Sequence, residues 1–166
     1  MIARRAAALL ACLGGAALAG EPASPPAATA ATVASAAWMR AVPPGARTAA
    51  IYLTLHGGAA GIDVVSASAP VAATVELHTT RAEGSMQRML RVPAFAVAAG
   101  ATRALRPGGD HLMLIGLARP LRDGDRLSLI LTLADGRTRR IDVPVLDLIA
   151  TGPDGAAAEA CCGAGP

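Results

Sequence analysis

The chain has 166 residues, a length typical of one domain with an additional segment at one end. Apolar residues make up 53% of the chain, enough for a packed core, while charged residues make up only 16%. This composition argues against a charged disordered chain. The single Trp, Tyr and Phe argue against the stacked aromatic platforms that bind single-stranded nucleic acid. The formal net charge of +3 implies no nucleic-acid partner.

Residues 1–19 have the features of a signal peptide. Arg4 and Arg5 provide a positive start, and the run from residue 6 to 19 carries no charge. The run ends in Ala17-Leu18-Ala19, the small-x-small pattern that precedes a cleavage site. It is too short to span a bilayer as a helix, which needs about 20 residues. We therefore expect cleavage after residue 19 and export of a soluble protein to the periplasm.

Two alternatives for this segment remain open. Leu9-Leu10-Ala11-Cys12 resembles a lipoprotein box, in which a lipid would be attached to Cys12. The apolar run before Cys12 is very short and continues past it, which favours the cleaved leader. The other alternative is an Ala-rich helix that stays attached to the protein.

The composition divides the rest of the chain into three parts. Residues 20–36 consist of little besides Ala, Pro, Ser and Thr, which predicts a linker. Residues 149–166 are rich in Gly and Ala and contain Cys161-Cys162, which predicts a flexible tail. A single domain is expected between them, over residues 37–148.

Alternation of apolar and polar residues predicts β-strands throughout this domain. The clearest runs, in chain order, are 51–55, 71–77, 111–117, 127–133 and 139–145. Asp135-Gly136 lies between the last two and predicts a hairpin turn. We find no capped amphipathic helix. Seven or eight short strands at this spacing indicate an all-β fold, a Greek-key sandwich or a small barrel.

Residues that can bind a soft metal ion gather between positions 78 and 113: they are His78, Met86, Met89, His111 and Met113. His111 and Met113 are two residues apart in a predicted strand, so their side chains point to the same face. His78 follows the alternating run 71–77, and a polar connection containing Gly84 separates it from Met89. A hairpin there would bring His78 and Met89 together, beside the second His and Met.

Such a set of ligands has a definite chemical preference. Thioether sulfur is soft and selects Cu(I) over hard ions such as Mg²⁺ or Ca²⁺, whereas Zn²⁺ rarely binds thioether. No Cys lies between residues 78 and 113, so a thiolate-centred blue-copper site cannot form there. The predicted site would hold and release copper and would not serve as a redox relay.

The spacing of His78, Met89, His111 and Met113 resembles the H-x10-M-x21-H-x-M signature of the PCuAC family of periplasmic copper chaperones. The similarity covers roughly residues 37–146. The blocks that carry it are Ala37-Trp38, Val42-Pro43-Pro44-Gly45, Ala50–Thr54, Val75–His78, Leu105–Gly109, His111–Leu117, Leu121–Asp125 and Val143–Val145. The resemblance implies a monomeric cupredoxin-like β-sandwich that binds one Cu(I) through these four residues. It also implies delivery of copper to the CuA centre of cytochrome c oxidase subunit II.

The chain departs from that family pattern in two places. Thr79 and Thr80 follow His78, where many members carry further methionines. The tail from Thr151 has neither His nor Met, so a second site for Cu(II) is not expected.

Several other residues are weaker candidates. Met86 stands at odd spacing from Met89, so we expect it to pack in the hairpin instead of binding metal. His56 is expected to be solvated in a loop, and Trp38 to anchor the first strand. The adjacent Cys161 and Cys162 are expected to have no role in copper transfer.

The functional alternatives belong to other classes. One is a periplasmic copper buffer or tolerance protein with the same site and no client. Another is an inert exported β-sandwich used in assembly. No enzyme is expected, because no nucleophile–base pair or paired carboxylates stand out. Cys161-Cys162 also lacks the C-x-x-C spacing of thiol oxidoreductases.

Overall fold

The computed structural model describes residues 33–84 and 86–153, and every regular element in them is a β-strand. The strands are β1 (Ala34–Arg40), β2 (Thr48–His56), β3 (Ile62–Ser68), β4 (Ala72–Glu83), β5 (Met86–Arg91), β6 (Phe95–Val97), β7 (Thr102–Leu105), β8 (His111–Leu117), β9 (Arg126–Leu133) and β10 (Thr138–Leu146). The predicted all-β class is confirmed. None of the described residues forms a helix long and apolar enough to cross a membrane.

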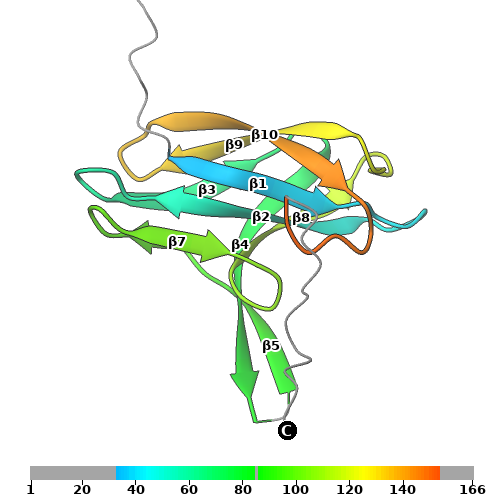
Figure 1. Ribbon diagram of the computed structural model, residues 1–166, viewed down its shortest axis with the longest axis horizontal. Coiled ribbons are helices and arrows are strands. Elements are labelled where there is room, and N and C mark those ends of the chain that lie inside the picture. The colour runs from blue at the N-terminus through cyan, green and yellow to red at the C-terminus, as the bar shows by residue number, and fades with distance from the viewer. Residues whose placement is uncertain (1–32, 85, 154–166) are drawn as a thin grey trace, which may run out of the picture.

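Seven of these strands form a closed barrel in the order β4-β8-β2-β1-β10-β9-β3 (Figure 1). The barrel closes where β3 pairs with β4, with Ala67 opposite Val75. β1 and β10 are parallel, and the other neighbouring strands are antiparallel. The remaining strands extend single barrel strands: β5 pairs with β4, β6 with β3 and β7 with β2.

The strands expected from alternation all form, as parts of β2, β4, β8, β9 and β10. Asp135-Gly136 makes the predicted turn between β9 and β10, where Gly136 has a φ of 82° that favours glycine. β1 begins at Ala34, three residues before the expected start of the domain. Ala36 has a φ of 49°, and the pairing of β1 with β2 shifts register there.

The segment between His78 and Met89 differs from the expected polar connection. β4 continues to Glu83, and β5 starts at Met86, so the two strands form one long hairpin. All six side chains of β5 are exposed. A strand with no buried side lacks the alternating pattern by which strands are recognised in a sequence. Figure 1 shows this hairpin projecting from the barrel.

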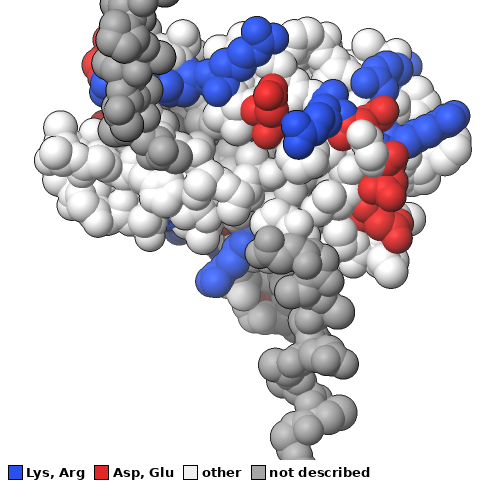
Figure 2. All heavy atoms as spheres, turned by 45° about the horizontal axis from the view of Figure 1, so that its top comes forward, with Lys and Arg blue, Asp and Glu red and all other residues white. Residues whose placement is uncertain are grey.

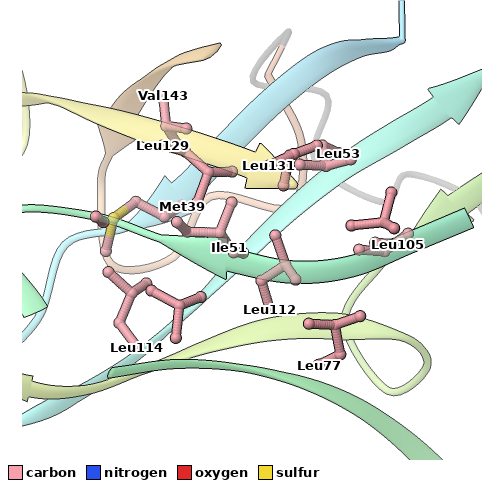
Figure 3. Packing of buried hydrophobic residues seen from close by; sticks show 14 of the residues in the cluster. Met39, Ile51, Leu53, Leu77, Leu105, Leu112, Leu114, Leu129, Leu131 and Val143 are labelled. Carbon is pink, nitrogen blue, oxygen red and sulfur yellow. The ribbon is translucent and has the colours of Figure 1, made fainter. Parts of the chain in front are cut away.

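The core fills the barrel interior with aliphatic side chains from nearly every barrel strand (Figure 3). Leu112 and Leu114 of β8 are 1% and 0% exposed, and Leu77 of β4 is buried beside them. Burying a leucine side chain contributes about 1.5–3 kcal/mol. Because side chains alternate along a strand, the inward leucines place His78, His111 and Met113 on the outer face of the same strands.

Charged residues do not gather by sign on the face that Figure 2 shows, where arginines and acidic residues are interspersed. Elsewhere in the described structure, charged residues form pairs, among them Arg119 with Asp125 at 2.7 Å and Arg137 with Asp135 at 2.6 Å. The described residues on the face in Figure 2 therefore form no extended basic patch.

Candidate metal centre

The centre of the candidate site is a pair of histidines on neighbouring strands. His78 of β4 lies directly opposite His111 of β8, and their ring centroids are 5.8 Å apart. Residues directly opposite each other in an antiparallel pair point to the same side of the sheet. Thus two imidazoles separated by 32 residues of sequence meet on the outer face of the barrel.

The two methionines lie on the rungs that flank this pair. Met113 is opposite Glu76, and Met89 is opposite Thr80, so both share the face of His78. Thr80 and Glu76 are four residues apart on β4, about 13 Å along the strand. Met113 is partly buried, whereas Met89 is 49% exposed on the hairpin. The structure therefore brings the histidines together and places the methionines on opposite sides of them.

The hydrogen bond of His111 shows which ring nitrogen carries the proton in the neutral form. Its Nδ1 lies 3.0 Å from the carbonyl oxygen of Gly109. A carbonyl can only accept, so Nδ1 carries the proton and the neutral ring has its lone pair at Nε2. The turn at Pro107-Gly108-Gly109 supplies this carbonyl, and Gly108 has a φ of 76° that favours glycine. His111 is 5% exposed, and its ring is held in one orientation.

His78 makes its hydrogen bond through Nε2, whereas His111 uses Nδ1. Its Nε2 lies 2.9 Å from Oε2 of Glu76, and the second carboxylate oxygen of Glu76 lies 3.2 Å from Nη1 of Arg91. The hydrogen bond from His78, with the nearby charge of Arg91, holds the pKa of Glu76 below its usual range. Glu76 is thus a carboxylate that accepts a hydrogen bond from the Nε2–H of His78. Nδ1 of His78 is buried without a hydrogen-bond partner among the described residues.

Aromatic side chains extend the site across the barrel surface. The rings of Tyr52 and His111 are 6.5 Å apart, and Trp38 packs on Tyr52 at 4.9 Å. Trp38 lies in β1 and is 5% exposed, with the guanidinium of Arg40 5.9 Å from its ring. Burial raises the pKa of the Tyr52 hydroxyl. These contacts connect the rings of Trp38, Tyr52 and His111 across three neighbouring strands.

Other predicted candidates lie apart from the histidine pair. Met86 points to the opposite face of the hairpin from Met89, as its odd spacing predicts. It does not pack in the hairpin as expected, because 72% of it is exposed at the tip. His56 is not solvated in a loop as expected: it ends β2, is partly buried, and its Nε2 contacts Ser35 Oγ at 2.6 Å. Cys161 and Cys162 lie outside the described residues.

Within residues 33–84 and 86–153, no three His, Cys, Asp or Glu side chains are arranged to hold a metal ion. Thioether sulfur is a further kind of ligand for a soft metal ion. The face that carries His78 and His111 also carries Met89 and Met113, so it offers such ligands.

The sequence did not predict the groups that surround the two candidate histidines, chiefly Glu76, Arg91 and Tyr52. The signal for Glu76 was available, because a residue two positions before His78 in a strand shares its face. The roles of Arg91 and Tyr52 depend on the pairing of strands, which the local pattern does not specify.

The barrel has the cupredoxin-like fold of PCuAC domains. The copper-bound PCuAC domain from PmoF2 aligns with a TM-score of 0.58 at 17% identity, over 69% of this chain and 91% of that domain. The solution structure of Cu(I)-DR1885 from Deinococcus radiodurans aligns with a TM-score of 0.58 at 39% identity, over 71% of this chain and 79% of that one. The apo form of DR1885 aligns over 90% of this chain with a TM-score of 0.56 and 33% identity.

The chain belongs to the LpqE-like family, described as "Putative lipoprotein LpqE-like", whose model matches residues 32–145. A curated relative is "Putative lipoprotein Lxx21020" from Leifsonia xyli subsp. xyli. It is 37% identical over 114 residues, which are 68% of each chain. The family match therefore covers the barrel from β1 to Val145, the second-last residue of β10.

Proposed function

We propose that this protein is an exported copper carrier that binds one Cu(I) ion through His78, Met89, His111 and Met113. The observation that carries the proposal is the pairing of β4 with β8, which sets His78 against His111 with ring centroids 5.8 Å apart. Imidazole and thioether together prefer a soft ion, and Cu(I) meets that preference. The 39% identity to a protein whose structure is named for its Cu(I) form supports the same ion.

Binding by all four residues requires the hairpin to move. Met89 and Met113 lie on rungs about 13 Å apart along β4, too far for both sulfurs to meet one ion beside His78 in an extended hairpin. A two-stranded hairpin outside the barrel is the part of this fold that bends at least cost. Met113 and the two histidines form the fixed part of the site, and Met89 arrives as β5 bends toward β8.

The half-exposed position of Met89 fits a site that releases its ion to another protein. The acceptor we propose is the CuA centre of cytochrome c oxidase subunit II, or another periplasmic copper carrier, with this protein acting as a monomer. A buffer without a client would bind copper equally well. Mixing the Cu(I)-loaded protein with the soluble CuA domain distinguishes the two, because only a carrier transfers its copper.

Export follows either of two routes through the first nineteen residues, which lie outside the described part of the chain. Cleavage after Ala19 would release a soluble periplasmic protein, whereas lipid attachment to Cys12 would anchor it. The relatives' names contain the word lipoprotein, which supports the second route more than the sequence alone does. Intact mass of the mature protein separates them, because only the second product retains Cys12 and carries a lipid.

Titration with Cu(I) against a chromophoric chelator tests the binding proposal. A chain truncated after Pro153 lacks Cys161 and Cys162 and keeps Ala150, whose carbonyl accepts a 2.6 Å hydrogen bond from Arg40. This chain should still bind one Cu(I). His111→Ala should lower the affinity by about 10-fold to 100-fold or more, since removal of supporting residues alone costs that much. The exposed Met86→Ala is the matched control and should change nothing. Loss of copper on truncation would assign the site to the thiols.

A further inference from the structure

Glu76 contacts both His78 and Arg91. Neither Glu76 nor Arg91 belongs to the copper-ligand motif. Glu76 lies on the face of His78 and on the rung of Met113, so its carboxylate stands inside the proposed site. Its side chain is 21% exposed, and that of His78 is 13% exposed. Because both side chains are partly buried, solvent screens this contact less than it screens a fully exposed pair.

The two oxygens of this carboxylate have different partners. Oε2 accepts the hydrogen bond from Nε2 of His78 at 2.9 Å, while Oε1 pairs with Nη1 of Arg91 at 3.2 Å. Arg91 lies directly opposite His78 in the pairing of β4 with β5. Glu76 therefore connects the histidine to the same strand that carries Met89.

The consequence for His78 is a fixed tautomer. A carboxylate accepts and does not donate, so the proton of the neutral ring stays on Nε2 and the lone pair stays on Nδ1. That Nδ1 is buried and has no hydrogen-bond partner in the described structure. A buried acceptor without a donor is unfavourable in the protein alone and becomes favourable when an electrophile reaches it.

We infer that Glu76 is the positioning residue of the copper site, which makes His78 bind Cu(I) through Nδ1 while His111 binds through Nε2. This inference rests on the proposed function. His111 has the opposite arrangement, because its Nδ1–H donates a hydrogen bond to the carbonyl oxygen of Gly109. Each ring thus has one nitrogen held by the protein and one available to the ion, as is general for histidines that bind metals.

The experiment uses the full mature protein labelled with ¹⁵N on histidine, at a pH where both rings are neutral. Two-bond ¹H–¹⁵N spectra of the metal-free protein report which nitrogen of His78 carries the proton. The wild type should show the Nε2–H form. Glu76→Leu should shift His78 toward the other tautomer or a mixture, and Glu76→Gln, whose amide oxygen still accepts, should keep the Nε2–H form.

A control variant comes from the same strand. Glu83→Gln removes a carboxylate that pairs with Arg88 at 3.4 Å near the exposed hairpin tip. It should leave both the His78 tautomer and the Cu(I) affinity unchanged. Glu76→Leu should bind Cu(I) about 10-fold to 100-fold more weakly than the wild type, the range typical for a group that orients a metal ligand. Glu76→Gln should retain most of the affinity.

Several results would overturn the inference. They are an Nδ1–H tautomer of His78 in the wild type, a Cu(I)-induced ¹⁵N shift at Nε2 of His78 instead of Nδ1, and an unchanged affinity in Glu76→Leu. If Glu76→Leu does not fold, the tautomer in Glu76→Gln decides, and a shifted tautomer there contradicts the inference. Failure of the wild type to bind copper refutes the proposed function, while the metal-free tautomer still tests the role of Glu76.

Discussion

Methionine has two distinct uses among the residues of this chain. Met39 is fully buried and fills the core, the ordinary use of a flexible apolar side chain. Met86 and Met89 are 72% and 49% exposed on β5, a strand whose six side chains are all exposed. Packing does not account for these two exposed apolar side chains, and the face of the hairpin separates them: Met89 shares the face of His78, whereas Met86 points to the opposite face.

We expect Cu(I) to perturb these methionines selectively. In a protein labelled with ¹³C on the methionine methyl groups, one equivalent of Cu(I) should shift the signals of Met89 and Met113, because a bound cation withdraws electron density from sulfur. Met39, in the core, and Met86, on the far face of the hairpin, should keep their positions. Shifts at Met86 equal to those at Met89 would contradict the assignment.

The carboxylate of Asp125 should contribute to the loss of folding stability at low pH. Asp125 accepts hydrogen bonds from the backbone N–H of Arg122 at 3.0 Å and from Arg119 at 2.7 Å. The backbone bond from Arg122 is the larger cause, and together they hold the pKa of Asp125 below its usual 3.8. A lowered pKa in the folded state gives stability that is present above the usual value and lost as pH falls through the folded value.

Asp125→Asn removes that titration while keeping an acceptor for Arg122. Thermal unfolding between about pH 6 and about pH 2.5 should therefore show a smaller loss of stability in the variant than in the wild type. Parallel loss in the two proteins would show that Asp125 does not contribute.

Strands with one buried face could be predicted from the sequence, whereas strands without a buried face could not. β9 and β10 alternate cleanly, and Asp135-Gly136 marks the turn between them. β5 has six exposed side chains and no pattern, so its segment reads as a polar connection. The sequence predicted that His78 would lie near His111 but not that the two would be directly opposite each other, because β4 and β8 are neighbours only in the closed barrel. Local alternation indicated the shared face of His111 and Met113 but not which strand lies beside it.

Strand β8 contains a glycine whose replacement should be costly. Gly116 has a φ of 71°, and a Cβ there would lie 2.8 Å from the methyl group of Ala73. Gly136 has a similar φ of 82° and open space around it. Gly136→Ala should therefore cost only the strain of positive φ, about 1–2 kcal/mol. Gly116→Ala should cost about 1–3 kcal/mol more, from crowding. Denaturant unfolding measures both, and equal losses would show that the contact with Ala73 relaxes freely.

On the scale of the whole molecule, the barrel separates stability from function. The core lies on the inner face of the strands, and the candidate ligands lie on the outer face of β4 and β8 and on the hairpin. A closed barrel has no free edges in its main sheet, so the histidine pair sits on a rigid support. The hairpin of β4 and β5 projects from this support (Figure 1). His78, His111 and Met113 lie on the barrel strands, whereas Met89 lies on the projecting hairpin, an arrangement that suits the proposed carrier.

X-ray absorption spectroscopy of the Cu(I)-loaded protein tests the central claim most directly, because it identifies the atoms bound to copper. The chain truncated after Pro153, with Cys12 removed by signal cleavage or replaced by Ser, should give a first shell of imidazole nitrogens and thioether sulfurs. His78→Ala and His111→Ala should each reduce the nitrogen contribution. A first shell of sulfur alone, or one that both substitutions leave unchanged, would contradict the account.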